Sequence, residues 1–271
     1  VVVNSKEIFS DYDYLSSNSK QLVLHYKKLT EKLVSKFRLN SKDLILDIGC
    51  NDGVLLNNYP SNFKKIYGYE PSNAYKNIKN KNISVINKFF SKKNAELFIK
   101  QNISPRIITI TNVFAHIDNI RDFTQGLSAI SNDKTIIIIE FPYLIDMIKK
   151  TYFDVIYHEH LSYLSLTPLI KLFKIFNLEI WDGEKLTIGA SGPALRIYVS
   201  KKNNHNVKSK RLKNLINYEK EWGIKKIKNY KNFSSKILKI KEQIIRIIIS
   251  IVKKNKKIGC FTAPAKGNTL L

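Results

Sequence analysis

The 271-residue chain is poor in cysteine, with only Cys50 and Cys260. Two cysteines supply neither a disulfide framework nor a thiolate zinc site by themselves, and such sparse use fits a reducing cytosol. The N-terminus has no basic region followed by an apolar signal stretch. The longest apolar run, residues 244–252, is interrupted by Arg246 and is too short to cross a bilayer. We therefore expect a cytoplasmic protein without a membrane segment.

Acidic residues are also scarce, since 22 Asp and Glu stand against 46 Lys and Arg and leave a net charge of +24. Such a balance normally suggests a polyanionic partner. Here the lysines are spread among asparagines and isoleucines along the whole chain, with no RNP motif, KH loop or zinc finger. We interpret the charge as mainly compositional and do not expect nucleic acid as a partner. A small substrate that carries phosphate would still gain from the positive field.

Short β-branched runs alternate with helix-compatible stretches over much of the chain. Apolar residues at helical spacing in residues 17–39 predict a first helix. Five strands are then predicted at 44–48, 65–69, 83–86, 107–110 and 135–139, with helical stretches at 53–59, 72–79, 92–101 and 119–130. This order predicts βαβ units and a parallel sheet that is covered on both faces.

Two more strands are predicted at 178–181 and 195–200, after a helix near 168–177. Five parallel strands followed by such an antiparallel edge pair are the layout of class I methyltransferases, a Rossmann-like α/β fold. We assign residues 1–40 to a helical lead-in and 41–200 to the α/β domain. The remainder, 201–271, is predicted to hold a helical linker, with a helix over 233–256, and the truncated start of a second α/β domain at a strand over 258–261. Because the chain starts at Val1 and stops within an apparently incomplete motif, we expect a fragment.

The run LDIGCNDG ends the first predicted strand and begins the predicted helical stretch that follows. It therefore lies at the edge where open sheets bind ligands. Gly49 and Gly53 permit a close approach of a ligand to the backbone. Glu70 ends the second strand, where an acid can accept hydrogen bonds from both ribose hydroxyls. A dinucleotide site is the rival interpretation, and a tight turn without a ligand is a third. Asp47 and Asp52 would repel a pyrophosphate but suit the cationic methionine part of S-adenosylmethionine.

The end of the fourth strand, Thr111-Asn112-Val113-Phe114, would form the other wall of the same crevice. Asn112 is its polar candidate, whereas Phe114 fits ordinary core packing. We therefore predict S-adenosylmethionine as the cofactor, bound by Asp47, Gly49, Asn51, Gly53, Glu70, Pro71 and Asn112.

Tyr157-His158-Glu159-His160 is the densest ionisable group in the sequence and follows the fifth strand. Two His beside a Glu can bind a metal, and a lone His is often structural. A third interpretation is proton transfer, because His titrates near neutrality and can accept a proton from carbon. His116, just beyond the fourth strand, would lie at the same end of the sheet, which favours catalysis and no metal.

Seven motifs occur in this order: LDIGCNDGVLL, YEPS, TNVFAHIDN, EFPYL, FDVIYHEHLSYLS, ALRIYV and APAKGNTLL. Together they resemble the sugar C-methyltransferase family, whose members make branched-chain sugars such as mycarose and noviose. The resemblance runs from the FSDYDYLSS segment to Leu271. Members combine an N-terminal zinc module, a central methyltransferase domain and a C-terminal α/β domain. We therefore expect the zinc module to be absent from this chain and the last domain to be incomplete.

The resemblance implies a nucleotide-linked 4-keto-deoxysugar as the substrate and His160 as the base. The other residues that it places at the sugar are Tyr157, Glu159 and His116, with Tyr12 or Tyr14 closing the site from the N-terminal side. One departure leaves the identity of the sugar open: many members have His-Gly-Gly-Ser before the arginine, where this chain reads IGASGPALR.

The chemistry that follows is methylation of carbon. A ketone acidifies the proton on the neighbouring carbon, His160 would remove it, and the enolate carbon would attack the sulfonium methyl. A placed general base typically contributes ~10²–10⁴-fold to the rate. The alternative is an O- or N-methyltransferase acting on another small molecule, which needs no carbanion stabilisation.

Overall fold

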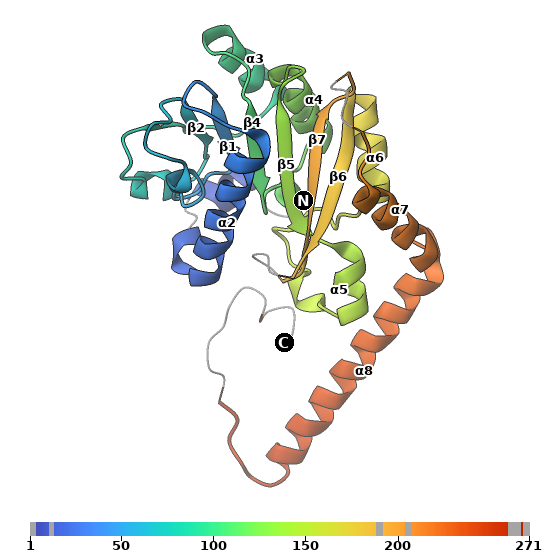
Figure 1. Ribbon diagram of the computed structural model, residues 1–271. Helices are drawn as coiled ribbons and strands as arrows, with labels where there is room; N and C mark the ends of the chain where they lie inside the picture. Colours follow the sequence, from blue (N-terminus) through green and yellow to red (C-terminus); the bar gives the residue numbers. More distant parts are fainter. Residues whose placement is uncertain (1–3, 11–13, 188–191, 204–206, 260–266, 268–271) are drawn as a thin grey trace.

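A computed structural model describes residues 4–10, 14–187, 192–203, 207–259 and 267 (Figure 1). Its centre is a seven-stranded sheet in the order β3-β2-β1-β4-β5-β7-β6. The strands are β1 (Ile45–Ile48), β2 (Ile66–Tyr69), β3 (Ile83–Ile86), β4 (Ile107–Thr111), β5 (Ile136–Pro142), β6 (Leu178–Leu186) and β7 (Ala194–Lys201). The first five are parallel, and β7 is antiparallel to both β5 and β6. The predicted class I arrangement is confirmed.

The α-helices are α1 (Ser5–Ser10), α2 (Lys20–Phe37), α3 (Lys92–Gln101), α4 (Ile120–Ile130), α5 (Leu144–Lys150), α6 (Leu166–Ile175), α7 (Lys210–Trp222) and α8 (Ile227–Val252). Short 3₁₀ segments are η1 (Ser16–Asn18), η2 (Leu56–Asn58), η3 (Asn73–Asn77), η4 (Phe114–His116) and η5 (Phe153–Val155). Serine side chains cap several of these helices. The hydroxyls of Ser19, Ser91 and Ser209 accept backbone N–H groups at the starts of α2, α3 and α7.

The alternation of side chains along β5 divides the core into two layers. Ile137 and Ile139 pack into a cluster with residues of α3, α4, α6 and α7. Ile136 and Ile138 face the opposite cluster, which includes the apolar stripe of α2. Both faces of the sheet are therefore covered, and α2 and α7 belong to the same core as the strands (Figure 1).

The sheet reverses its strand order between β1 and β4. From β1 the chain moves outward to β2 and β3, and then returns to pair β4 with the other edge of β1. The connections that leave β1 and β4 diverge at this point, which opens a crevice at the carboxyl ends of the two strands. This crevice is where open α/β sheets bind their ligands.

Two predicted helical stretches are wrong. Residues 53–59 and 72–79 form turns with only the short segments η2 and η3. Gly53 is left-handed at φ +73°, and Pro60 disfavours a helical conformation in the residue before it. In the second stretch polar side chains bind the backbone instead. Ser72 accepts the Ala74 N–H at 3.1 Å, and Asn77 donates to the Ala74 carbonyl.

Strand β6 extends to Leu186, five residues beyond its predicted end at Trp181, and is irregular between Ile180 and Asp182. Its polar residues were not expected in a covered strand. They are accommodated because Asp182 and Glu184 form ion pairs with Arg211 of α7 and basic residues of α2.

Helix α8 extends away from the sheet, and none of its side chains is buried (Figure 1). Of the strand predicted at 258–261, residues 258 and 259 are not extended into a strand, and the other two lie outside the described residues. None of the helices in the described ranges combines the length and the apolarity that crossing a bilayer requires.

Candidate active site

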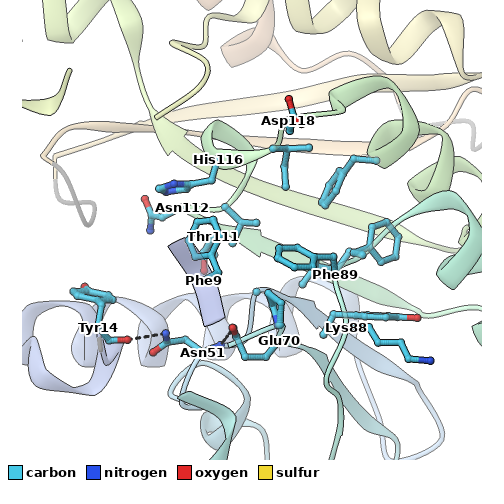
Figure 2. Close-up of a pocket in the computed structure, with 18 of the residues that line it drawn as sticks. Phe9, Tyr14, Asn51, Glu70, Lys88, Phe89, Thr111, Asn112, His116 and Asp118 are labelled. Atoms are coloured by element: carbon cyan, nitrogen blue, oxygen red, sulfur yellow. Dashed lines mark hydrogen bonds between the residues drawn. The ribbon is translucent and has the colours of Figure 1, made fainter. Parts of the chain in front are cut away.

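A cavity of about 390 Å³ lies at the carboxyl ends of β1, β2 and β4 (Figure 2). Of the predicted cofactor residues, its wall contains Gly49, Asn51, Glu70, Pro71 and Asn112. Of the predicted reaction residues, its wall contains Tyr14 and His116. The structure therefore gathers residues that are far apart in the sequence around one hollow.

The loop after β1 needs glycine at position 49. Gly49 has φ +77°, and a Cβ there would lie 2.3 Å from Cγ2 of Val113, which lines the same cavity. The N–H groups of Gly49 and Cys50 donate to the Tyr69 carbonyl at 2.8 and 3.1 Å and tie the loop to β2. The backbone thus follows the cavity wall at a distance that a larger residue would not allow.

Glu70 presents a fixed carboxylate at the cavity. One oxygen accepts the Asn51 N–H at 2.7 Å and the other accepts the Ser72 N–H at 2.9 Å, and the residue is only 5% exposed. Asn87 donates to the carbonyls of Glu70 and Pro71 and holds this corner in place. Because each carboxylate oxygen can accept more than one hydrogen bond, Glu70 retains acceptor capacity for a ligand.

Asp47 and Gly53, which were also predicted to bind the cofactor, are not among the residues that line the cavity. Asp47 is buried and accepts the Thr109 hydroxyl at 2.6 Å. Burial raises the pKa of Asp47 to about 7, and the neighbouring charges of Glu70 and Glu140 act in the same direction against the Thr109 hydrogen bond. A Cβ on Gly53 would lie 2.9 Å from Ile78, so this glycine is required for packing.

Asn112 stands at the opposite wall in a left-handed conformation, with φ +60°. Its amide nitrogen donates to the Tyr26 hydroxyl at 3.4 Å, and the Thr111 hydroxyl donates to the same oxygen at 3.3 Å. Its buried Oδ1 has no hydrogen-bond partner among the residues that the structure describes. A buried acceptor without a partner costs free energy, which makes Oδ1 a natural contact for a ligand donor.

His116 belongs to η4 and faces the cavity from the far side (Figure 2). Its Nδ1 lies 2.9 Å from the Glu159 carbonyl, which can only accept, so Nδ1 carries the proton. Burial lowers the pKa of His116 to about 4, with a further contribution from His160. His116 is therefore neutral at neutral pH, with its lone pair on Nε2.

His160 is 8% exposed, and its ring centre lies 4.9 Å from that of His116. Neither His160 nor Tyr157 is among the residues that line the cavity. Its Nδ1 lies 2.8 Å from the Val155 carbonyl and so carries the proton in the neutral ring. The lone pair of that ring is on Nε2, which lies 3.4 Å from the Tyr157 hydroxyl. Burial raises the pKa of Tyr157 to about 12, so its hydroxyl stays protonated at neutral pH.

The other predicted residues lie around this pair. Glu159 is half-buried and meets His116 through its carbonyl, whereas His158 is exposed. Tyr14 is 44% exposed at the cavity wall, and Tyr12 lies outside the described residues. Within the described ranges, no group of three or more His, Cys, Asp or Glu is arranged to hold a metal ion.

Several residues of the cavity wall were not singled out from the sequence, among them Phe9, Ser16, Tyr26, Lys88 and Phe89. Tyr26 fits the apolar stripe of a core helix, so its position gives no hint of a ligand. Phe9 and Ser16 belong to the FSDYDYLSS segment, and this segment was the one signal that could have indicated them.

Comparison with known proteins agrees with this architecture. A family model described as a methyltransferase domain matches residues 22–182, and one described as a C-methyltransferase C-terminal domain matches residues 189–271. The C-methyltransferase NovU of Streptomyces niveus is 25% identical over 271 residues, which is 100% of this chain and 64% of NovU. The chain therefore spans less than two thirds of that relative. An uncharacterised methyltransferase of Schizosaccharomyces pombe is 38% identical over 61 residues, 22% of this chain and 24% of that protein.

Solved structures show the same fold at low sequence identity. An S-adenosylmethionine-dependent methyltransferase of Anabaena variabilis has a TM-score of 0.51 at 13% identity, covering 66% of this chain and 85% of that one. One from Clostridium acetobutylicum has a TM-score of 0.50 at 13% identity, covering 65% and 90%. With more than half of its length matched by the methyltransferase domain, the chain belongs to the methyltransferase-domain family, and its residues from 189 onward are similar to the C-methyltransferase C-terminal domain.

Proposed function

We propose that this chain is the S-adenosylmethionine-dependent part of a C-methyltransferase that methylates the carbon next to the ketone of a nucleotide-linked 4-keto-deoxysugar. His160 is the general base in this proposal. The observation that carries it is the arrangement of His160, whose protonated Nδ1 donates to the Val155 carbonyl and leaves the Nε2 lone pair beside Tyr157.

The cavity fits S-adenosylmethionine. Its volume of about 390 Å³ falls in the range of small-molecule sites. Glu70 offers carboxylate oxygens to a pair of ribose hydroxyls, and the Gly49 backbone leaves room for the methionine part. The Oδ1 of Asn112, which has no hydrogen-bond partner within the described ranges, suits the ammonium group at that end. When bound, this cofactor supplies an electrophilic methyl group on a positively charged sulfur.

The residues of the chain then have to remove a proton from carbon. His160 accepts that proton at Nε2, because Nδ1 is already protonated and held by Val155. The resulting imidazolium keeps its Nδ1 hydrogen bond, which a charged donor makes stronger. Val155 thus fixes both the tautomer and the orientation of the base.

The enolate oxygen needs a hydrogen-bond donor, and Tyr157 is better suited than His116. The phenol of Tyr157 stays protonated because burial raises its pKa to about 12. In neutral His116 the only ring proton, on Nδ1, is already donated to the Glu159 carbonyl. We therefore assign the donor role to Tyr157.

The test is turnover of a panel of nucleotide-linked 4-keto-deoxysugars with a labelled methyl donor, followed by NMR of the product. The proposal predicts a new carbon–carbon bond next to the ketone. A methyl group on oxygen or nitrogen would support the alternative of an O- or N-methyltransferase. Binding of S-adenosylhomocysteine, measured separately by calorimetry, shows whether the cofactor half is intact when no sugar reacts.

A further inference from the structure

The loop that follows β1 is hydrogen-bonded to the N-terminal segment of the chain as well as to β2. The Asn51 side chain uses both of its ends in this contact. Its Oδ1 accepts the Ser16 N–H at 2.9 Å, and its Nδ2 donates to the Tyr14 carbonyl at 2.9 Å (Figure 2). The next residue, Asp52, accepts the Ser17 N–H at 3.0 Å. Three hydrogen bonds therefore join two adjacent loop residues to residues 14–17.

This segment forms part of the cavity wall. Tyr14 and Ser16 line the cavity, and so does Phe9 on the other side of the undescribed residues 11–13. The Phe9 ring packs against Phe89 and His116, with ring centres 6.5 and 5.9 Å apart. The N-terminal residues thus contact both the loop after β1 and His116, whose ring lies next to that of the proposed base.

The same loop residue is also tied to the acid that faces the cavity. The Asn51 N–H donates to Glu70 at 2.7 Å, and its backbone is left-handed at φ +51°, a conformation that Asn tolerates better than most residues. Asn51 therefore connects the carboxylate proposed to hold the ribose with the segment that carries Tyr14.

We propose that Asn51 and Asp52 form a clasp that positions Tyr14 at the substrate side of the cavity, so that binding of the methyl donor and the placement of Tyr14 are coupled. This inference rests on the proposed function. In it Asn51 is a positioning residue for the acceptor, acting through Tyr14, in addition to lining the cofactor cavity. Coupling of this kind is reciprocal, so an ordered N-terminal segment also favours cofactor binding.

Hydrogen exchange tests the clasp directly, because the Ser16 and Ser17 amides are its donors. In the parent protein, S-adenosylhomocysteine should slow exchange of these two amides. Asn51→Gly keeps the left-handed backbone accessible and removes both side-chain bonds. It should speed exchange at Ser16 about tenfold or more and abolish the protection by the ligand. Asn58→Ala is the matched control, because within the described residues the Asn58 side chain bonds to the nearby Val54 carbonyl and not to the N-terminal segment, and its exchange pattern should equal that of the parent.

The acceptor provides the second readout. Asn51→Gly should weaken S-adenosylhomocysteine binding by the coupling that it removes, and should lower kcat/KM for the keto-sugar by a larger factor, about tenfold. Combined with Tyr14→Ala, it should add no further loss, because both substitutions remove the same placement.

Unchanged exchange at Ser16 and Ser17 in Asn51→Gly would overturn the clasp. A loss of ligand affinity larger than the loss of acceptor efficiency would overturn it too, since Asn51 would then act only as a cofactor contact. Exchange and ligand binding need no acceptor. The clasp can therefore stand or fall even if no keto-sugar in the panel is methylated.

Discussion

Replacing Gly49 with alanine should damage cofactor binding and stability together. The left-handed conformation, φ +77°, costs an alanine about 1–2 kcal/mol. The new Cβ would also lie 2.3 Å from Cγ2 of Val113, and such overpacking typically costs about 1–3 kcal/mol. We expect the free energy of unfolding to fall by about 2–5 kcal/mol and the S-adenosylhomocysteine affinity to fall at least about tenfold, since Val113 must move within the cavity wall. Urea unfolding and calorimetric titration measure the two effects.

Gly223→Ala separates backbone strain from the effect on the cavity. Gly223 ends α7 with φ +78°, nearly the same angle, and an added Cβ would meet the Lys226 side chain, which is exposed and can move. This variant should lose about 1–2 kcal/mol of stability and keep its ligand affinity. If Gly49→Ala binds S-adenosylhomocysteine as tightly as the parent, the loop after β1 does not hold the cofactor.

Three further substitutions test other parts of the account. Glu70→Gln leaves one acceptor oxygen for two backbone N–H groups, so calorimetry should show at least about tenfold weaker binding of S-adenosylhomocysteine, and parental affinity would contradict the ribose role. Burial lowers the pKa of His116 to about 4, so between pH 6.5 and 4 the unfolded chain binds a proton that the native chain does not. The share of His116 in the free energy of unfolding should thus fall by about 3 kcal/mol as the pH drops through this range. In His116→Gln, the free energy of unfolding measured with denaturant should depend less on pH over the same range. An unchanged pH dependence would contradict the lowered pKa of His116. Glu219, which is fully buried and accepts hydrogen bonds from Tyr143, Leu166 and Thr167, holds α7 to α6, so Glu219→Ala should cost about 3–5 kcal/mol in urea unfolding and leave ligand affinity intact in the folded protein. A cost below about 1 kcal/mol would show that these donors find other partners.

The sheet could be predicted because its strands are β-branched runs of buried residues. In β5 the run of four isoleucines leaves no good alternative to a covered strand. Residues 92–101 have apolar positions at helical spacing, and α3 has the predicted bounds. The turns at 53–59 and 72–79 were not predicted. Gly53 and Pro60 disfavour a helix in the first stretch, and hydrogen bonds from the Ser72 and Asn77 side chains compete with helix formation in the second.

The candidate site was only partly predictable for a different reason. Glycines and acids that end strands are visible in a sequence, and Gly49, Glu70 and Asn112 do line the cavity. Tyr26 occupies a position that any core helix fills with an apolar or aromatic residue, so its hydroxyl contact with Asn112 was invisible. The contact between Asn51 and Tyr14 joins residues that are 37 positions apart, and no local pattern encodes it.

The most direct test of the central claim is exchange of the sugar proton next to the ketone. With S-adenosylhomocysteine in place of the methyl donor, the enolate has no methyl group to attack, and reprotonation from D₂O marks the carbon with deuterium. NMR should show exchange in the parent and in His158→Asn, whose altered side chain is exposed in the same motif. His160→Asn should slow that exchange by about 10²-fold or more while S-adenosylhomocysteine affinity stays unchanged. Exchange at the parental rate in His160→Asn would show that His160 is not the base.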